Sequence, residues 1–438
     1  MLSRPGRTLI ISSLLLRRAH LSPLAVISQF HSSVPRLNDI ILKSSVTSPE
    51  LNSDLTKLSL PVFLLKDYLT KDKKDLEAIV DGNTGASLTY GDIFYSATSF
   101  SDSLSSKMGV DKGDRVAIIS PNHLHFFTAF LGISLSQAVS TCMNPVLSAD
   151  EVFYQLEKTQ AKLVIAHPMC LETVLKVVPK ERVIVMDDGV NDTKDYGMTK
   201  LSSLMSTAPN KAAESKLAIP KDFDPFSLVT VPFSSGTTGR SKGVMLTHHN
   251  LVSNVLQTMP FEGQYLKAAD GRPRGTLLCP LPFFHIYGLV AGILVCSYAS
   301  AKLIFMPSFD LKKYLELIQQ HKVTRCFVVP PIVLALAKHP LVDQYDLSSV
   351  NCFMSGAAPL GPELQVAAAK RLNTLVKQAW GMTETSPCGT ITPDDQVITL
   401  CLSPSSNSIM SRMILIFVCV FRLLLWEVWR DFKVHQAS

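Results

Sequence analysis

Residues 228–250, LVTVPFSSGTTGRSKGVMLTHHN, decide the fold, because they place a buried strand, a loop and the start of a helix in direct succession. Between Ser234 and Gly239, two glycines let the backbone turn tightly and four hydroxyl side chains add hydrogen-bond donors. Lys242 supplies a compact positive charge suited to a polyphosphate. A flexible Ser/Gly linker is the alternative, but linkers rarely join a buried strand to a helix. The stretch therefore predicts a phosphate-binding loop.

The spacing of this loop differs from that of the Walker loop. In the Walker loop, lysine directly follows the second glycine and precedes Ser or Thr. Here two residues separate Gly239 from Lys242, and no Walker acid strand is recognisable. Both observations disfavour a P-loop phosphotransferase.

The chain from residue 43 to residue 393 continues the alternation of strands and helices. Short β-branched runs that end in Pro, Asp or Gly predict buried strands at 115–120, 162–166, 182–187, 228–233, 302–307 and 325–330. Amphipathic stretches predict helices at 248–257, 311–321 and 362–372. This alternation predicts an α/β fold with mostly parallel sheets and ligand sites at the carboxyl ends of the strands. The polar stretch 189–222 is interpreted as a connecting surface loop.

The composition excludes several classes of protein. The 438 residues are 47% hydrophobic and 18% charged, which rules out a disordered, collagen-like or coiled-coil chain. The net charge of +6 is too small and too dispersed to indicate a nucleic-acid partner. Nine irregularly spaced cysteines without a CxxC pair indicate reduced thiols. The pairs His123/His125 and His248/His249 lack partners at metal spacing and are interpreted as surface or capping histidines.

The two ends differ from the middle. Residues 1–38 contain no Asp or Glu but several arginines and many serines, which is typical of a mitochondrial transit peptide. A secretory signal and an unstructured terminus are the alternatives. In residues 396–438, the longest uncharged apolar run (413–421) is well short of the ~20 residues that a membrane span needs. This tail is therefore interpreted as a non-homologous segment joined to a shortened domain, and peroxisomal, cytosolic or membrane-associated locations stay open.

Four stretches together resemble a known family. SSGTTGRSKGVMLTHHN (234–250) resembles the signature of the adenylate-forming superfamily, which includes acyl-CoA synthetases, luciferases and 4-coumarate–CoA ligases. PLPFFHIYGL (280–289), SGAAPLG (355–361) and WGMTETSP (380–387) match later motifs in the expected order. The resemblance is nearest to the 4-coumarate–CoA ligase branch. It implies that residues 43–395 form the large N-terminal domain of these enzymes, with layered β-sheets and helices.

The resemblance also implies a reaction and a set of site residues. Such enzymes activate a carboxylic acid, here a phenylpropanoid or fatty acid, with ATP and Mg²⁺, and then transfer the acyl group to CoA. His285 would lie over the reacting carboxylate, Thr383 would bond the α-phosphate and Glu384 would bind magnesium. The ATP-binding residues would be Ser234, Ser235, Gly236, Thr237, Thr238, Gly239, Lys242, Gly356, Ala357, Ala358, Pro359, Trp380 and Gly381. The acyl-pocket residues would be Tyr287, Gln378 and Ala379.

Some of these roles have simpler alternatives. His285 taken alone is compatible with a packed core histidine, and Trp380 with a core aromatic residue at the end of a strand. Ala379 stands where the coumarate branch usually has glycine, which is expected to narrow the acyl pocket.

Parts of the family pattern are absent after Thr385. Neither the ribose-binding Asp in a Thr-Gly-Asp context, nor the hinge, nor the small C-terminal domain with its catalytic lysine is found, and Lys433 has no matching context. Loss of one such charge-stabilising group commonly costs about 2.7–4 kcal/mol of transition-state stabilisation. The sequence therefore leaves two functions open: an acid–CoA ligase, and a catalytically impaired product that binds only nucleotide or partner subunits. For turnover by these 438 residues, the absences favour the second.

Overall fold

The structure is a computed structural model. It describes residues 51, 53–189, 192–209, 211–234, 240–268, 271–395, 397 and 414–415. All of them belong to the second of two units, Ser44–Ser438. The leader predicted at 1–38 and almost all of the tail predicted at 396–438 lie outside the described residues.

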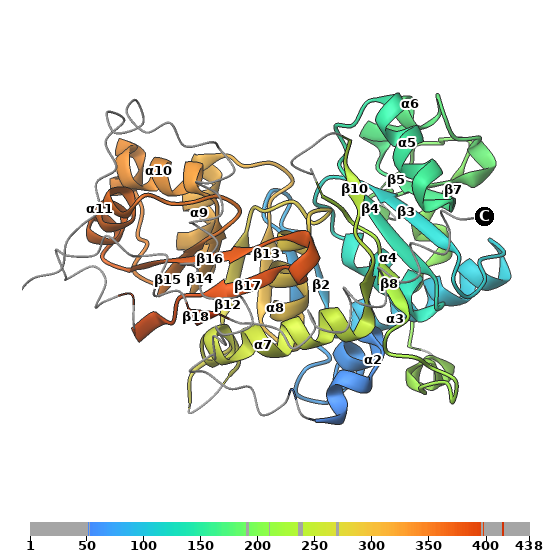
Figure 1. Cartoon of the computed structure of the whole chain (residues 1–438), viewed down its shortest axis with the longest axis horizontal. Coiled ribbons are helices and arrows are strands. Elements are labelled where there is room, and N and C mark those ends of the chain that lie inside the picture. Colours follow the sequence, from blue (N-terminus) through green and yellow to red (C-terminus); the bar gives the residue numbers. More distant parts are fainter. Residues whose placement is uncertain are drawn as a thin grey trace, which may run out of the picture. The chain divides into compact units, whose positions relative to one another are not determined.

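Two large sheets carry the described part of the chain (Figure 1). One has nine strands in the order β18-β17-β16-β15-β14-β12-β13-β1-β2, and its six strands from β16 to β1 run parallel. Antiparallel strands flank this parallel centre. The bounds are β1 Glu77–Asp81, β2 Ser87–Thr89, β12 Thr276–Cys279, β13 Lys302–Phe305, β14 Arg325–Val328, β15 Cys352–Ser355, β16 Leu375–Gly381, β17 Cys388–Ile391 and β18 Ile414–Leu415.

The second sheet has seven strands among the described residues, in the order β11-β8-β4-β3-β5-β6-β7. All neighbours are parallel except β11, which is antiparallel to β8. A two-stranded antiparallel ribbon, β9 with β10, follows β8 along the chain. The bounds are β3 Arg115–Ile119, β4 Val139–Met143, β5 Ala161–Ala166, β6 Val183–Val185, β7 Thr199–Lys200, β8 Leu228–Thr230, β9 Phe233–Ser234, β10 Lys242–Gly243 and β11 Leu246–Thr247.

Helices cover both sheets. The α-helices are α2 Leu60–Leu65, α3 Tyr90–Ser106, α4 Phe126–Leu135, α5 Ala149–Thr159, α6 Leu171–Val174, α7 His248–Leu266, α8 Val295–Tyr298, α9 Leu311–His321, α10 Pro330–Lys338 and α11 Pro362–Leu372. A π-helical segment, Tyr287–Leu294, leads directly into α8. Short 3₁₀ turns occur at Asp54–Lys57, Pro168–Cys170, Lys180–Arg182, Leu201–Leu204, Lys211–Leu217, Pro340–Gln344 and Thr383–Thr385.

Local sequence signals explain where the longer helices begin and end. Capping boxes start α3, α5 and α7, where Thr89, Ser148 and Thr247 each accept a bond from the backbone three residues later. Left-handed residues terminate α9 and α11, with φ of 48° at both Lys322 and Asn373. These signals are local, which is why the sequence predicted 311–321 and 362–372 with the observed bounds.

The buried apolar residues form three clusters that give the fold its layers. The largest cluster joins α3, α4, α7 and α8 to residues of both sheets. A second lies between the nine-stranded sheet and α9, α10 and α11, which gather over one side of that sheet in Figure 1. A third lies between the seven-stranded sheet and α5 with α6. The predicted α/β fold with layered, mostly parallel sheets is confirmed.

Two local predictions differ from the structure. The helix predicted at 248–257 continues to Leu266, with Pro260 inside it, because both flanks of α7 are buried against neighbouring elements. The stretch 189–222 is not only a surface loop, since it contains β7, and Leu201 and Leu204 are buried in the largest cluster. The polar composition of this stretch hid its few core residues. Among the described residues, no helix combines the length and apolar character that crossing a membrane requires.

Two of the histidines interpreted as surface or capping residues, His123 and His248, do accept bonds from backbone N–H groups, but both are buried. His123 accepts a bond from the His125 N–H, and His248 accepts one from the N–H of Leu60, the first residue of α2, at 3.0 Å. His248 is only 5% exposed, and burial lowers its pKa to about 4. Its neutral form is therefore part of the folded state.

We expect the protein to lose stability in acid through His248. Because the pKa is lower in the folded than in the unfolded state, the contribution is complete above about pH 6.5 and is lost as the pH falls toward 4. His248→Asn, which keeps an acceptor but cannot titrate, should reduce the loss of unfolding free energy between pH 7 and pH 5 by about 2 kcal/mol. Urea titrations at both pH values measure this. His339→Asn, at an exposed capping histidine, is the control. If both variants lost the same unfolding free energy between pH 7 and pH 5, His248 would not be the source of the acid sensitivity.

Candidate active site

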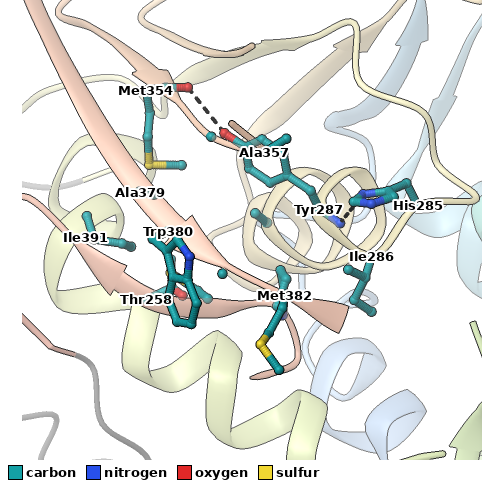
Figure 2. Close-up of a pocket in the computed structure, with 15 residues that line it drawn as sticks. Thr258, His285, Ile286, Tyr287, Met354, Ala357, Ala379, Trp380, Met382 and Ile391 are labelled. Atoms are coloured by element: carbon teal, nitrogen blue, oxygen red, sulfur yellow. Dashed lines mark hydrogen bonds between the residues drawn. The ribbon is translucent and has the colours of Figure 1, made fainter. Parts of the chain in front are cut away.

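An apolar pocket opens beside the carboxyl end of β15 and the last residues of β16. The space between its atoms, counted together with open solvent at its mouth, is about 490 Å³. Figure 2 shows the side chains that surround it. The lining residues are Thr258, His285, Ile286, Tyr287, Ala291, Met354, Gly356, Ala357, Ala379, Trp380, Gly381, Met382, Pro387, Cys388 and Ile391.

Tyr287 forms one wall of the pocket, at the start of the π-helical segment. Its hydroxyl donates to the carbonyl of Met354 at 3.2 Å, drawn as a dashed line in Figure 2. Gly356 must lack a side chain, because a Cβ there would lie 2.9 Å from the tyrosine ring. The two motifs that carry these residues therefore meet in space and shape one wall.

His285 lies at the mouth of the pocket with one nitrogen already used. Its Nδ1 accepts a bond from the backbone N–H of Tyr287 at 3.2 Å. The imidazole is accessible to solvent, yet partial desolvation lowers its pKa below the ordinary value. A neutral ring with an accepting Nδ1 carries its proton on Nε2. His285 can therefore donate one hydrogen bond to an oxygen of a bound acid, and the alternative of a packed core histidine is wrong.

Trp380 forms the opposite side of the pocket. Its ring lies against the backbone of Gly389 in β17, where a Cβ would come within 2.7 Å of the ring. The side chain is 48% exposed, so the alternative of a core tryptophan is wrong. A half-exposed indole at the mouth of an apolar pocket offers a flat surface on which a ring can stack.

The turn Thr383–Thr385 connects the pocket to the phosphate loop. Thr383 is buried, whereas Glu384 is exposed and accepts a bond from the Ser234 hydroxyl at 3.3 Å. Carboxylate and hydroxyl oxygens are ligands that Mg²⁺ prefers. The residues present fit a magnesium ion bound jointly with phosphates, although no group of three or more His, Cys, Asp or Glu in the described part of the chain is arranged to hold a metal by itself.

The ends of the predicted phosphate loop meet in the β9–β10 ribbon. Ser234 pairs directly with Lys242, whose side chain is exposed. Ser241 is held against α5, because its carbonyl accepts from Tyr154 and its hydroxyl accepts from Gln155 at 3.2 Å. The predicted ligands Ser235, Gly236, Thr237, Thr238 and Gly239 lie outside the described residues. The ribbon nevertheless places a hydroxyl, a lysine and Glu384 at one edge of the site.

Of the residues predicted to form the acyl pocket or the adenine wall, three do not line the pocket: Gln378, Ala358 and Pro359. Gln378 uses both ends of its amide elsewhere, because Oε1 accepts from the Leu360 N–H and Nε2 donates to Gln365. It thereby ties the loop after β15 to β16. Ala358 and Pro359 are exposed beyond Ala357, which has a positive φ of 70°. Only Gly356 and Ala357 of the predicted adenine wall line the pocket.

Several lining residues were not predicted from the sequence. Thr258, Ile286, Ala291, Met354, Met382, Pro387, Cys388 and Ile391 complete the pocket. Ile286, Met382 and Pro387 lie within motifs that were recognised, so adjacency could have pointed to them. Thr258 and Ile391 reach the pocket only because α7 and β17 pack beside β16. This packing cannot be predicted from the residues next to them in the sequence.

Asn254 holds the turn that carries Glu384. It is 2% exposed on α7, and its amide bonds both the N–H and the carbonyl of Cys388, at 3.1 and 2.9 Å. It also donates to the carbonyl of Thr385 at 3.3 Å. The side chain of one helix residue thus fixes both sides of the 383–388 segment.

We expect Asn254→Ala to lower the free energy of unfolding by about 2–4 kcal/mol, because it leaves buried backbone groups without partners. Chemical denaturation followed by circular dichroism measures the loss. Gln319→Ala is the control, since it removes one hydrogen bond at an exposed helix position and should change stability by less than about 1 kcal/mol. Equal losses for the two variants would contradict the role given to Asn254.

A parallel α/β sheet with an apolar pocket beside a phosphate-type loop is typical of the class of domains that bind a nucleotide together with a small molecule. Comparison with known proteins places the chain within this class. Residues 67–405 match the model of the AMP-binding enzyme family, and the chain belongs to that family.

The relatives with the most similar sequences include plant ligases. The chain is 38% identical over 334 residues to 4-coumarate–CoA ligase 1 of Petroselinum crispum, covering 75% of this chain and 57% of that protein. It is 34% identical over 359 residues to 4-coumarate–CoA ligase 3 of Arabidopsis thaliana, covering 80% and 62%. The chain thus spans about three fifths of the length of these relatives.

Solved structures share the fold. The N-terminal domain of FACL13 from Mycobacterium tuberculosis is 25% identical, with a TM-score of 0.63, and the match covers 78% of this chain and 80% of that one. A luciferase-like enzyme from the mealworm Zophobas morio superposes with a TM-score of 0.68 at 22% identity, covering 84% and 81%. The predicted assignment to the large N-terminal domain of the adenylate-forming enzymes is confirmed.

Proposed function

We propose that this chain provides the acid- and nucleotide-binding part of an acid–CoA ligase. In the first step, a carboxylate oxygen of the acid attacks the α-phosphorus of ATP and pyrophosphate leaves. In the second step, the sulfur of CoA attacks the acyl carbon and AMP leaves. The observation that carries this proposal is the turn after the pocket residue Met382, where Glu384 accepts a hydrogen bond from Ser234 at one end of the phosphate loop.

The residues of the site divide these tasks by their chemistry. The apolar lining favours an aromatic or aliphatic acid, in keeping with the ligases of 4-coumarate among the relatives. The Nε2–H of His285 is available to orient the carboxylate, and Lys242 offers positive charge to the phosphates. Glu384 and Ser234 would hold Mg²⁺ together with the phosphates. That ion offsets the negative charge that otherwise repels an attacking carboxylate.

ATP–pyrophosphate exchange by the full 438-residue chain tests the proposal. We expect exchange with at least one acid from a panel of cinnamates and fatty acids. Glu384→Gln should lower the rate by about 10²–10³-fold, because the variant loses the carboxylate that would hold Mg²⁺ beside the phosphates. Glu172→Gln is the control, at an exposed carboxylate in a surface ion pair. Absence of exchange with every acid would overturn the enzymatic proposal and favour a chain that only binds nucleotide or partner subunits.

We also propose a mitochondrial location, on the basis of the acid-free, arginine-containing segment 1–38. Fusion of these residues to a fluorescent protein should direct it to mitochondria. Replacement of Arg4, Arg7, Arg17 and Arg18 by glutamine should abolish this. Secretion of the fusion, or an even distribution through the cell, would contradict the proposal.

A further inference from the structure

Four charged side chains form a buried network beneath the pocket. Arg325 binds Glu262 through Nε and Nη2, both at 3.0 Å, and binds Asp394 through Nη1 at 2.8 Å. Lys377 binds the same two carboxylates, each at 2.6 Å. The side chains of Arg325, Lys377 and Glu262 are fully buried, and that of Asp394 is 7% exposed. We call these four residues the charge quartet.

The quartet is balanced in charge and closed. Two cations face two carboxylates, and each cation contacts both of them. Burial opposes the charged form of Arg325, yet the adjacent carboxylates, Glu262 above all, raise its pKa above the ordinary value. The guanidinium also lies 4.2 Å from the centre of the Tyr265 ring. Burial opposes the charged forms of Lys377 and Asp394 as well, yet their partners in the quartet raise the pKa of Lys377 and lower that of Asp394.

Three members of the quartet are close in sequence to residues that line the pocket. Glu262 lies one helical turn after Thr258 on α7. Lys377 lies two residues before Ala379 on β16, so both side chains face the same side of the strand. Asp394 lies three residues after Ile391, and the Thr392 N–H bonds the Gln378 carbonyl between them at 3.1 Å. The quartet thus joins the three elements that supply different walls of the pocket.

Arg325 links this junction to the centre of the sheet. It is paired in register with Cys352 of β15, which is paired in turn with Leu375 of β16. From β14, its side chain reaches Asp394 beyond β16. The anchoring point of these walls is therefore a strand in the middle of the parallel sheet.

A general stabilising role does not explain such a network. Buried ion pairs are often no more stabilising than apolar residues of the same volume, because both charges lose their hydration. Their advantage is directional, since a guanidinium and a carboxylate fit in one geometry, whereas apolar side chains slide over one another. Directional ion pairs are therefore suited to a site in which three separate elements must keep fixed positions relative to one another.

We propose that the charge quartet positions the α7, β16 and β17 walls of the pocket and so determines how well the acid is bound, independently of the nucleotide. This inference rests on the proposed function, in which the pocket receives the acid. Glu262, Arg325, Lys377 and Asp394 are positioning residues, because none of them lines the pocket. Their effect passes through Thr258, Ala379 and Ile391.

Measurements of ligand binding test the proposal without depending on catalytic turnover. The full chain carries Trp426→Phe and Trp429→Phe, so that Trp380 is the only tryptophan and reports on the pocket. Titrations with 4-coumarate, with octanoate and with ATP are compared for Lys377→Met, Asp394→Asn and the double variant. Each single variant unbalances the quartet by one charge, whereas the double variant leaves the neutral pair Glu262–Arg325. Lys302→Met is the control, at an ion pair with Glu77 in the same sheet.

We expect each single variant to weaken binding of the acid by about tenfold or more, since displacements of about 1 Å at a site have effects of this size or larger. The affinity for ATP should change less than that for the acid, because the predicted phosphate ligands Ser234 and Lys242 lie in the β9–β10 ribbon and not in these three walls. The double variant should recover at least part of the acid affinity, and Lys302→Met should resemble the parent chain. A purely stabilising network would instead weaken both ligands in parallel with the loss of unfolding free energy.

Three results would overturn the proposal. These are unchanged acid affinity in both single variants, parallel losses for acid and ATP, and a double variant that does not unfold cooperatively. Failure of the proposed function looks different, because ATP–pyrophosphate exchange would be absent while Trp380 still reported acid binding that depends on the quartet. If the parent chain binds neither acid, the pocket is not an acid site and the inference falls with it.

Discussion

Arg325→Met should lower the free energy of unfolding by about 3–5 kcal/mol. The variant keeps an apolar side chain of similar length but leaves two buried carboxylates with one lysine. Charge removed from one side of a buried network leaves the other side uncompensated in a medium of low polarity. The variant also removes a hydrogen bond to Asp394. Burial raises the pKa of Asp394, and the bond from Arg325 is one of the contacts that keep that pKa low.

Urea denaturation followed by circular dichroism measures this loss, with the slope against urea compared between variants to confirm that the same transition is observed. Arg371→Met is a matched control, because Arg371 pairs with a largely exposed Asp343 at 2.9 Å. Exposed pairs contribute about 0–1 kcal/mol, so the control should remain close to the parent chain. Similar losses for the two arginine variants would show that the buried network contributes no more to the free energy of unfolding than an exposed ion pair.

Gly381→Ala should disrupt the site strongly, although it adds only one methyl group. A Cβ at this position would lie 2.0 Å from the carbonyl oxygen and 2.9 Å from the carbonyl carbon of Pro387. Both are backbone atoms and cannot rotate away, so β16 and the segment before β17 would have to separate. Gly381 also lies at an irregularity in the pairing of these strands, where a glycine permits close approach of two backbones.

The expected result is a loss of about 10²-fold in ATP–pyrophosphate exchange, because Trp380 and Glu384 on either side of Gly381 would be displaced together. Gly361→Ala is the control, since a Cβ there meets no atom within 4 Å and the backbone is not left-handed. Exchange assays and thermal denaturation of both variants distinguish the two positions. Unchanged exchange in Gly381→Ala would show that the close approach to Pro387 is not required at the site.

The elements that the sequence predicted correctly depend on local signals. The strand at 115–120 and the helix at 362–372 are defined by β-branched runs, helix periodicity and residues that begin or end them. The helix at 248–257 was predicted too short, because packing around α7 keeps the helix intact through Pro260 to Leu266. Local patterns report the preference of a segment, and burial on both sides can override that preference.

The same distinction applies to the site. His285, Tyr287, Gly356 and Trp380 were predicted because each lies in a motif that can be recognised along the chain, and the structure brings them to one pocket. Gln378 is in such a motif as well, yet its amide is used within the fold. A motif identifies which residues are present near a site, but the direction of each side chain depends on its neighbours in space.

The amino-acid sequence by itself determined the α/β class, several of the strands and helices, and the family, and it predicted the position of a phosphate loop. Periodicity, capping and contiguous motifs are properties of neighbouring residues, and they can be read without a structure. Only the tertiary structure decided that Thr258 and Ile391 face the same pocket, and that Glu262, Arg325, Lys377 and Asp394 meet beneath it. These residues come from four elements separated by as many as 132 positions (Glu262 to Asp394). Contacts between them arise when the sheet and α7 pack, because burial of two cations requires two carboxylates at hydrogen-bond distance, whatever their separation along the chain.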